Sequence, residues 1–128
     1  MRYMMFIKHP GDYDVSEVPP SLFGAMGEFV EEHVRNGTSI DGAGLQPLSK
    51  ATRVRLAGGK ITVTDGPFSE AKEVVGGYSL IEASTHAEAV ALATRFMELH
   101  RTHWPDFEGE SEVRPLQDMG DPPPPSGA

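Results

Sequence analysis

The chain has no cysteine among its 128 residues, so disulfide bonds, thiol catalysis and cysteine-ligated metals are excluded. It also lacks any apolar run close to the roughly 20 residues that are needed to span a bilayer. The short apolar start from Met1 to Lys8 is not followed by a small-residue cleavage site, which argues against a secretion signal. We therefore expect a cytoplasmic protein with no membrane partner.

Positive charge is scarce, because 11 Lys and Arg residues stand against 19 Asp and Glu residues and the formal net charge is −8. An acidic domain repels phosphate backbones, so no nucleic-acid partner is expected. The length suits one domain with a modest core. Residues 117–128 contain four consecutive prolines and no hydrophobic pattern. We therefore predict one domain over residues 1–116, followed by a disordered, Pro-rich tail.

Hydrophobic periodicity predicts a series of strands and helices. The segment from Tyr3 to Lys8 is rich in β-forming residues and apolar on both faces. A strand of this kind is covered on both sides, in this case by helices on one side and by a second subunit on the other. The expected strands cover residues 3–8, 38–45, 53–56, 61–64, 78–83 and 112–116, and the expected helices cover residues 19–36 and 85–104.

The predicted fold class is α+β. The order β-α-β, hairpin, β-α-β matches a ferredoxin-like βαββαβ unit with an inserted β-hairpin over residues 53–64. Such a unit has an antiparallel sheet with both helices on one face, which leaves the other face uncovered. Because the first strand is apolar on both sides, we expect two copies to pack these faces together as a homodimer, a dimeric α+β barrel.

The most specific motif is DGPFSEAKE, from Asp65 to Glu73, between the hairpin and the next strand. It resembles the DGPFAETKE signature of the bacterial YCII-related (DGPF) family, with Ser69 in place of Ala and Ala71 in place of Thr. The flanking segments 52–55, 59–60, 76–78 and 112–115 also resemble the family. The resemblance extends over residues 1–116.

The resemblance implies a dimeric ferredoxin-like α+β barrel whose activity is mostly unknown. Some members are encoded beside extracytoplasmic-function sigma factors. A distant branch is associated with a catalytic His–Asp pair, whose histidine corresponds to residues 25–27, where this chain has no histidine. Ala71 also lacks the hydroxyl that is usual in the family, so a mechanism that needs this hydroxyl fails here.

Candidate site residues gather where the first strand is expected to end. His9 should lie near Lys72 and Glu73, because the first strand and the strand that contains Tyr78 are expected to be antiparallel neighbours. A histidine beside carboxylates can act as a general acid or base near neutral pH. The candidate catalytic residues are His9 and Asp65, and the candidate ligand-binding residues are Phe68, Lys72, Glu73, Tyr78 and Arg114.

A purely structural interpretation competes with each of these assignments. Asp65 would accept local hydrogen bonds in a rigid Asp-Gly-Pro turn, Phe68 would fill the core, and His9 would close its strand at the surface. His33 and His86 have no evident partner and are expected to be exposed.

Metal and cofactor binding are not predicted. His100 and His103 have a spacing that metal ligands can adopt, but cationic side chains stabilise a helix C-terminus without any metal. The sequence assigns no third ligand to this pair. The glycine pairs Gly58-Gly59 and Gly76-Gly77 fit no nucleotide-binding loop.

Three functions remain open at this point. The first is the binding or transformation of a small molecule in a cleft of the dimeric barrel. The second is a non-catalytic regulatory or interaction protein linked to extracytoplasmic-function sigma-factor signalling. The third, cofactor-free oxygenation or isomerisation, rests on analogy between folds alone.

Overall fold

The computed structural model describes residues 1–11, 15–68 and 72–117, and the account of the fold is confined to these residues. They form an α+β structure with two α-helices, six strands and two short 3-10 turns, 15–17 and 48–50. The principal elements are, in chain order, β1 (Arg2–His9), α1 (Pro20–Arg35), β2 (Ser39–Gly44), β3 (Thr52–Ala57), β4 (Lys60–Asp65), β5 (Val74–Glu82), α2 (His86–His103) and β6 (Glu110–Pro115).

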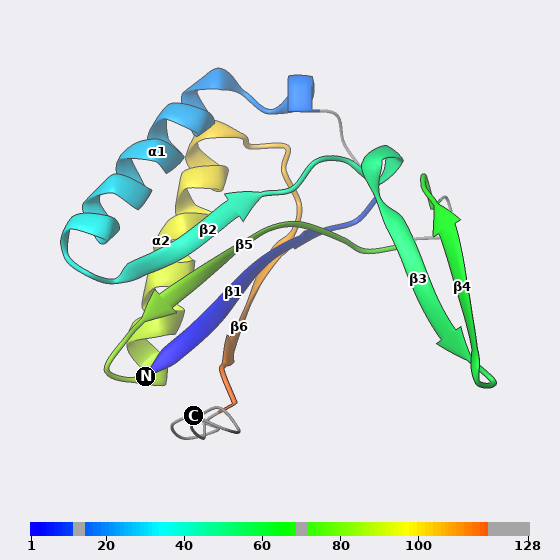
Figure 1. Ribbon diagram of the computed structural model, residues 1–128. Coiled ribbons are helices and arrows are strands. Elements are labelled where there is room, and N and C mark those ends of the chain that lie inside the picture. Colours follow the sequence, from blue (N-terminus) through cyan, green and yellow to red (C-terminus); the bar gives the residue numbers. More distant parts are fainter. Residues whose placement is uncertain (12–14, 69–71, 118–128) are drawn as a thin grey trace, which may run out of the picture.

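Four strands form an antiparallel sheet in the order β2-β5-β1-β6, and both helices lie on one of its faces (Figure 1). This arrangement is compatible with the predicted ferredoxin-like fold. Strands β3 and β4 pair with each other as a separate two-stranded sheet, which is named the β3–β4 arm below. Figure 1 shows this arm on the side of the main sheet that faces away from the helices.

The turn of the β3–β4 arm needs glycine at two positions. Gly58 and Gly59 have φ values of 58° and 75°, a left-handed conformation that side chains with a Cβ disfavour. Two consecutive residues of this kind are typical of the tight turns whose twist matches that of paired strands. The predicted strand boundaries within the arm differ from the observed ones by a single residue at each end.

The helix ends follow the signals in the sequence. Glu88 N donates to the Thr85 hydroxyl at 3.1 Å, and Ser84 N donates to the Glu88 carboxylate at 2.9 Å, so the start of α2 is capped from both directions. Helix α1 begins with Pro20 in its first turn and is followed by Gly37 at a φ of 79°. The predicted capping of α2 is confirmed.

The core lies between α2 and one face of the two central strands. Tyr3 and Met5 of β1 and Ile81 of β5 are buried against α2. Residues Ala89, Leu92 and Ala93 supply the helix side of this cluster. Small side chains at positions 89 and 93 allow the helix to approach the sheet closely, which explains why the larger residues of β1 are almost fully buried.

Helix α1 is packed much less completely than α2. Leu22 is buried, whereas Val30 and Val34 of the same predicted apolar stripe are 46% and 56% exposed. The apolar face of α1 is therefore left partly uncovered by its own chain.

Two predictions fall partly or wholly on residues outside the described ranges. These are the tail, of which residues 118–128 are not described, and the centre of the DGPFSEAKE motif, residues 69–71. Among the described residues, no helix is long and apolar enough to cross a membrane.

Candidate functional site

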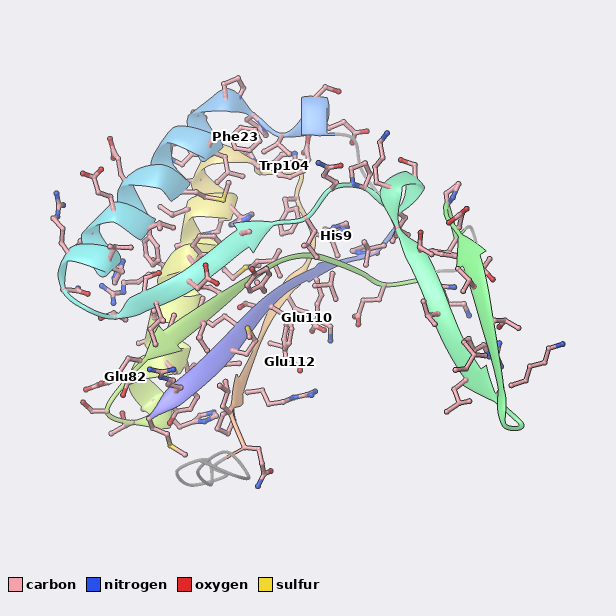
Figure 2. All side chains as sticks on the ribbon, viewed as in Figure 1. His9, Phe23, Glu82, Trp104, Glu110 and Glu112 are labelled. Atoms are coloured by element: carbon pink, nitrogen blue, oxygen red, sulfur yellow. The ribbon has the colours of Figure 1, made fainter. Side chains whose placement is uncertain are left out.

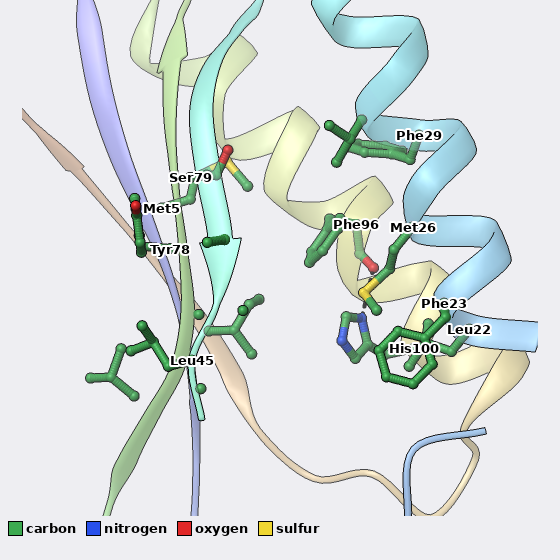
Figure 3. Close-up of a pocket in the computed structure, with 18 of the residues that line it drawn as sticks. Met5, Leu22, Phe23, Met26, Phe29, Leu45, Tyr78, Ser79, Phe96 and His100 are labelled. Atoms are coloured by element: carbon green, nitrogen blue, oxygen red, sulfur yellow. Dashed lines mark hydrogen bonds between the residues drawn. The ribbon is translucent and has the colours of Figure 1, made fainter. Parts of the chain in front are cut away.

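A cleft of about 1090 Å³ lies between α1 and the strands β2 and β5, and it is named the helix–sheet cleft below (Figure 3). Leu22, Met26 and Phe29 of α1 line one wall. Phe96 and His100 of α2 point into the same space from behind, as Figure 3 shows. The lining is mainly apolar, with a few polar groups among hydrocarbon and aromatic side chains.

The strands opposite α1 explain why this space is not filled. Strand β2 contributes Gly42, Ala43 and Gly44 to the cleft, and β5 contributes Gly76 and Gly77. These residues carry no side chain, or only a methyl group, so little reaches across to meet the large side chains of α1. Gly42 and Gly77 are also held close to the neighbouring strand, because a Cβ at either would press on backbone atoms there. The glycines thus allow tight strand pairing and leave the cleft empty of side chains.

His100 is the most informative polar group in the cleft. Its ring is buried, and its Nδ1 lies 3.0 Å from the Phe96 carbonyl oxygen. Because a carbonyl oxygen only accepts, Nδ1 carries the hydrogen and donates it. In a neutral imidazole the lone pair then lies on Nε2, and no residue of the described ranges bonds to that atom.

Burial also sets the charge of His100. Loss of solvent lowers the pKa of His100, and the hydrogen bond to the Phe96 carbonyl opposes this only in part. The imidazole is therefore neutral at neutral pH, with an acceptor nitrogen on the side of the cleft. It can accept a hydrogen bond from a bound molecule or take a proton from it.

His9 lies at the same end of the cleft and is also buried. Its Nδ1 is 2.6 Å from the Gly11 carbonyl oxygen, which makes Nδ1 the donor, as in His100. The Phe107 ring lies 6.4 Å from the His9 ring and 4.9 Å from the His100 ring, so it connects the two histidines. His9 was predicted as a site residue from the sequence. His100 was considered only as a possible metal ligand or as a positive charge at the C-terminus of its helix.

The expectation that His33 is exposed is wrong. Its side chain is buried, its Nδ1 lies 2.6 Å from the Phe29 carbonyl oxygen, and its ring is 4.2 Å from the Phe29 ring. The burial of His33 could have been predicted from the helical spacing, because positions 22, 26, 29 and 33 fall on one face of α1. His33 contributes a third imidazole to the wall of the cleft.

Asp65 and Phe68 lie at the base of the β3–β4 arm and do not line the helix–sheet cleft. The Thr52 hydroxyl donates to the Asp65 carboxylate at 2.9 Å, across the first pair of the arm. Phe68 is buried, with the Arg53 guanidinium 3.7 Å from its ring centre. A side chain at Gly66 would collide with the Leu48 carbonyl, so this glycine is needed for close packing. These contacts favour a structural role for the turn.

Glu73 and Arg114 belong to an ion cluster around Lys8 on the sheet face that the helices leave uncovered. Lys8 Nζ lies 3.1 Å from Glu73 and 3.0 Å from Glu112, and Arg114 lies 2.7 Å from Glu112. The hydrogen bond to Glu112 is the main cause that raises the pKa of Lys8, and it lowers the pKa of Glu112. His9 pairs with Val74, next to Glu73 in sequence, but it is Lys8 that binds this carboxylate.

The remaining two predicted ligand-binding residues differ in position. Lys72 is exposed. Tyr78 borders the cleft as part of β5, and its register opposite Phe6 places its side chain on the face away from the helices. Among the residues of ranges 1–11, 15–68 and 72–117, no group of three or more His, Asp and Glu side chains could hold a metal ion.

The model of the YCII-related domain matches residues 1–98, so the chain belongs to the YCII-related family and the resemblance is confirmed. Strand β6 lies beyond the matched residues but pairs with β1 along its length. An uncharacterised protein of Rhizobium meliloti (strain 1021) is 35% identical over 74 residues, which are 58% of this chain and 56% of that protein. The chain therefore spans little more than half the length of this relative.

The hydrogen bond between Thr52 and Asp65 gives a first prediction. Thr52→Val removes the donor and Asp65→Ala removes the acceptor, so each should lower the free energy of unfolding by about 1 kcal/mol. The double variant should cost about as much as either single variant, because both remove the same bond. Asp65→Asn, which keeps an acceptor oxygen, should lose less. Urea unfolding measures these values, and fully additive losses would contradict the pairing.

Burial of His100 gives a second prediction, on pH. Its folded-state pKa is below the unfolded value near 6.5, so the unfolded chain binds this proton more tightly. The free energy of unfolding is therefore highest above pH 6.5, where His100 is neutral in both states, and it declines as the pH falls below that value. His100→Gln should therefore lose less stability than wild type between pH 7 and pH 5. Thermal unfolding at both pH values measures this. The exposed His86→Gln serves as the control and should behave like wild type.

Proposed function

We propose that the protein binds a small, mainly apolar molecule in the helix–sheet cleft, and that His100 and His9 contact a polar group of that molecule. The observation that carries the proposal is an apolar cleft of about 1090 Å³ with neutral His100 at one end. Ligand sites in proteins are typically concave and mainly apolar, with a few convergent polar groups, and have volumes of roughly 300–1,000 Å³.

The chemistry of the histidines narrows the kind of ligand. Each of the two imidazoles donates through Nδ1 to a backbone carbonyl, and in His100 this leaves Nε2 as an acceptor toward the cleft. An acceptor surrounded by apolar side chains favours a ligand that offers a donor, such as a hydroxyl group. A ligand of the same shape without the donor would leave Nε2 buried with no partner, which is costly. The expected ligand is therefore an apolar molecule with a hydroxyl group.

This site differs from the one that the sequence analysis favoured. His9 remains at the cleft, whereas the Tyr78 side chain lies on the other face of the sheet. Asp65, Phe68, Glu73 and Arg114 have partners elsewhere. The proposal retains the binding of a small molecule but replaces the cleft of a dimeric barrel with a cleft inside each subunit.

We also propose that the protein is a homodimer with a ferredoxin-like fold, in which the β3–β4 arm is an insertion between β2 and β5. Met4, Phe6, Tyr78 and Leu80 form an apolar strip, named the open-face strip, on the sheet face away from the helices. All four are half-buried. An apolar strip on two central strands is suited to packing against the same strip of a second copy.

The alternative function is a non-catalytic regulatory or interaction protein linked to extracytoplasmic-function sigma-factor signalling. This alternative function requires no ligand in the helix–sheet cleft. A test of ligand binding therefore separates the two functions.

A pair of matched probes tests the cleft. 2-Naphthol carries a hydroxyl donor, and 2-methoxynaphthalene has a similar ring system without the donor. Wild type should bind 2-naphthol at least tenfold more tightly, a difference of about 1.4 kcal/mol. In His100→Phe, which keeps a ring but loses the acceptor, the ratio of the two dissociation constants should fall toward one. Fluorescence titration measures both constants.

The exposed His86→Phe is the control for this titration and should keep the wild-type ratio. If wild type binds neither probe, the proposed site is wrong and the regulatory alternative is favoured.

The open-face strip gives a prediction of its own. Met4→Glu places a carboxylate opposite Arg114 in the register of β1 and β6, where a single subunit can accommodate it. In a dimer the same charge would be buried between two apolar strips, so the dissociation constant should rise at least 100-fold. Sedimentation equilibrium at micromolar concentrations measures it. Val90→Glu, on an exposed apolar position of α2, should leave the dimer intact.

A further inference from the structure

The β3–β4 arm has one face that is apolar beyond its base, where the polar pair Thr52 and Asp65 lies on the same side. Val54 pairs with Val63, and Leu56 pairs with Ile61, so all four side chains lie on the same side of the two strands. They are between 66% and 70% exposed. The opposite side of the arm is polar, with Arg53 and Arg55 facing threonines across the pair.

Nothing in the described part of the same chain covers this face. Within these residues, β3 and β4 pair with each other and with no strand of the main sheet. The two strands of the arm are joined at its base, where Gly66 N donates to the Ala51 carbonyl at 2.7 Å and Thr52 bonds to Asp65. Figure 1 shows the rest of the arm extending away from the body of the molecule.

An arm with this exposed apolar face is not expected to be stable in water without a covering layer. A two-stranded hairpin has marginal stability unless a further layer packs against it. Each side chain of this size exposes roughly 80 Å² of apolar surface, so the four together present roughly 300 Å². Contiguous apolar patches of a few hundred Å² usually mark a contact surface.

The charges favour a second copy of this chain as the partner. The arm carries three basic residues, Arg53, Arg55 and Lys60, and one acidic residue, Asp65. The whole chain carries 11 basic and 19 acidic residues, so the remainder of the molecule is strongly acidic. Arg53, Arg55 and Lys60 lie on the polar side of the arm, away from its apolar face. Their charge therefore acts over a distance, and it attracts the arm to the acidic body of another copy.

The position of the arm points to the same partner. It lies on the side of the main sheet where the helices are absent, and Figure 2 shows Glu110 and Glu112 on that side. A second copy placed against this sheet face would come within reach of the arm. In a two-fold dimer the contact occurs twice, so the two arms and the surfaces that they cover bury roughly 1,200 Å², which reaches the range of specific interfaces.

We propose that the apolar face of the β3–β4 arm, formed by Val54, Leu56, Ile61 and Val63, packs on a second copy of the chain, so that each subunit is embraced by the arm of the other. This contact is separate from the packing of the open-face strips. It stabilises the β3–β4 arm, which has no second layer within a single subunit.

A variant with threonine at all four positions tests this inference. Val54→Thr and Val63→Thr keep the side-chain shape, and Leu56→Thr and Ile61→Thr keep a high strand propensity, while the apolar surface is lost. The dissociation constant of the dimer, measured by sedimentation equilibrium, should rise at least 100-fold. The control is Thr62→Val with Thr64→Val on the opposite face of the arm, which should change the constant less than threefold.

Amide hydrogen exchange provides a second measurement that needs no change in the arm. Amides of β3 and β4 should exchange slowly in the wild-type dimer and at least tenfold faster when the dimer is dissociated by dilution. This result decides the matter if the four-threonine variant does not fold.

Three outcomes would overturn the inference. The first is a folded four-threonine variant that dimerises as tightly as wild type, and the second is arm amides whose exchange is the same in dimer and monomer. The third is a wild-type chain that stays monomeric at micromolar concentration, which would point to a different protein as the partner. If Met4→Glu leaves the dimer intact while the four-threonine variant disrupts it, the open-face contact is wrong and the arm contact stands.

Discussion

The burial of one face of β1 against α2 is the interaction on which the rest of the structure depends. Tyr3 and Met5 fill the space above the sheet, and Ala89 and Ala93 let α2 approach closely. Because side chains alternate along a strand, this burial places Met4 and Phe6 on the opposite face, where the described chain provides no second layer. The helices, the uncovered face and the direction in which the β3–β4 arm extends are all defined relative to this strand.

The same packing accounts for the helix–sheet cleft. Helix α2 takes the central position over β1 and β5, so α1 lies over the edge of the sheet, next to β2. There it faces glycine and alanine, which are too small to reach its large apolar side chains. Phe96 of α2 and Phe107 close one end of the space and bury His100, which makes this imidazole neutral. The cleft and the state of its histidine thus have a common origin.

The sequence alone was sufficient for the alternation of strands and helices, the capping of α2, the glycine turn of the arm and the family, because these depend on local signals. Spacing of apolar residues and the chemistry of caps and turns act over a few positions, and no partner far away in the chain changes their meaning. The same local reasoning placed His9 at the end of β1, since a strand end can be read from the residues around it.

Only the tertiary structure decided which polar residues share a site. Asp65 binds Thr52 and Glu73 binds Lys8, and neither carboxylate lines the cleft that His9 borders, although all were predicted to border one cleft. His9 instead lies near His100, which is 91 positions later in the chain. The Phe107 ring lies against both imidazoles. Side-chain burial, hydrogen-bond partners and the empty space under α1 arise from contacts between distant segments. Such contacts depend on how the helices pack over the sheet, which no local pattern in the chain specifies.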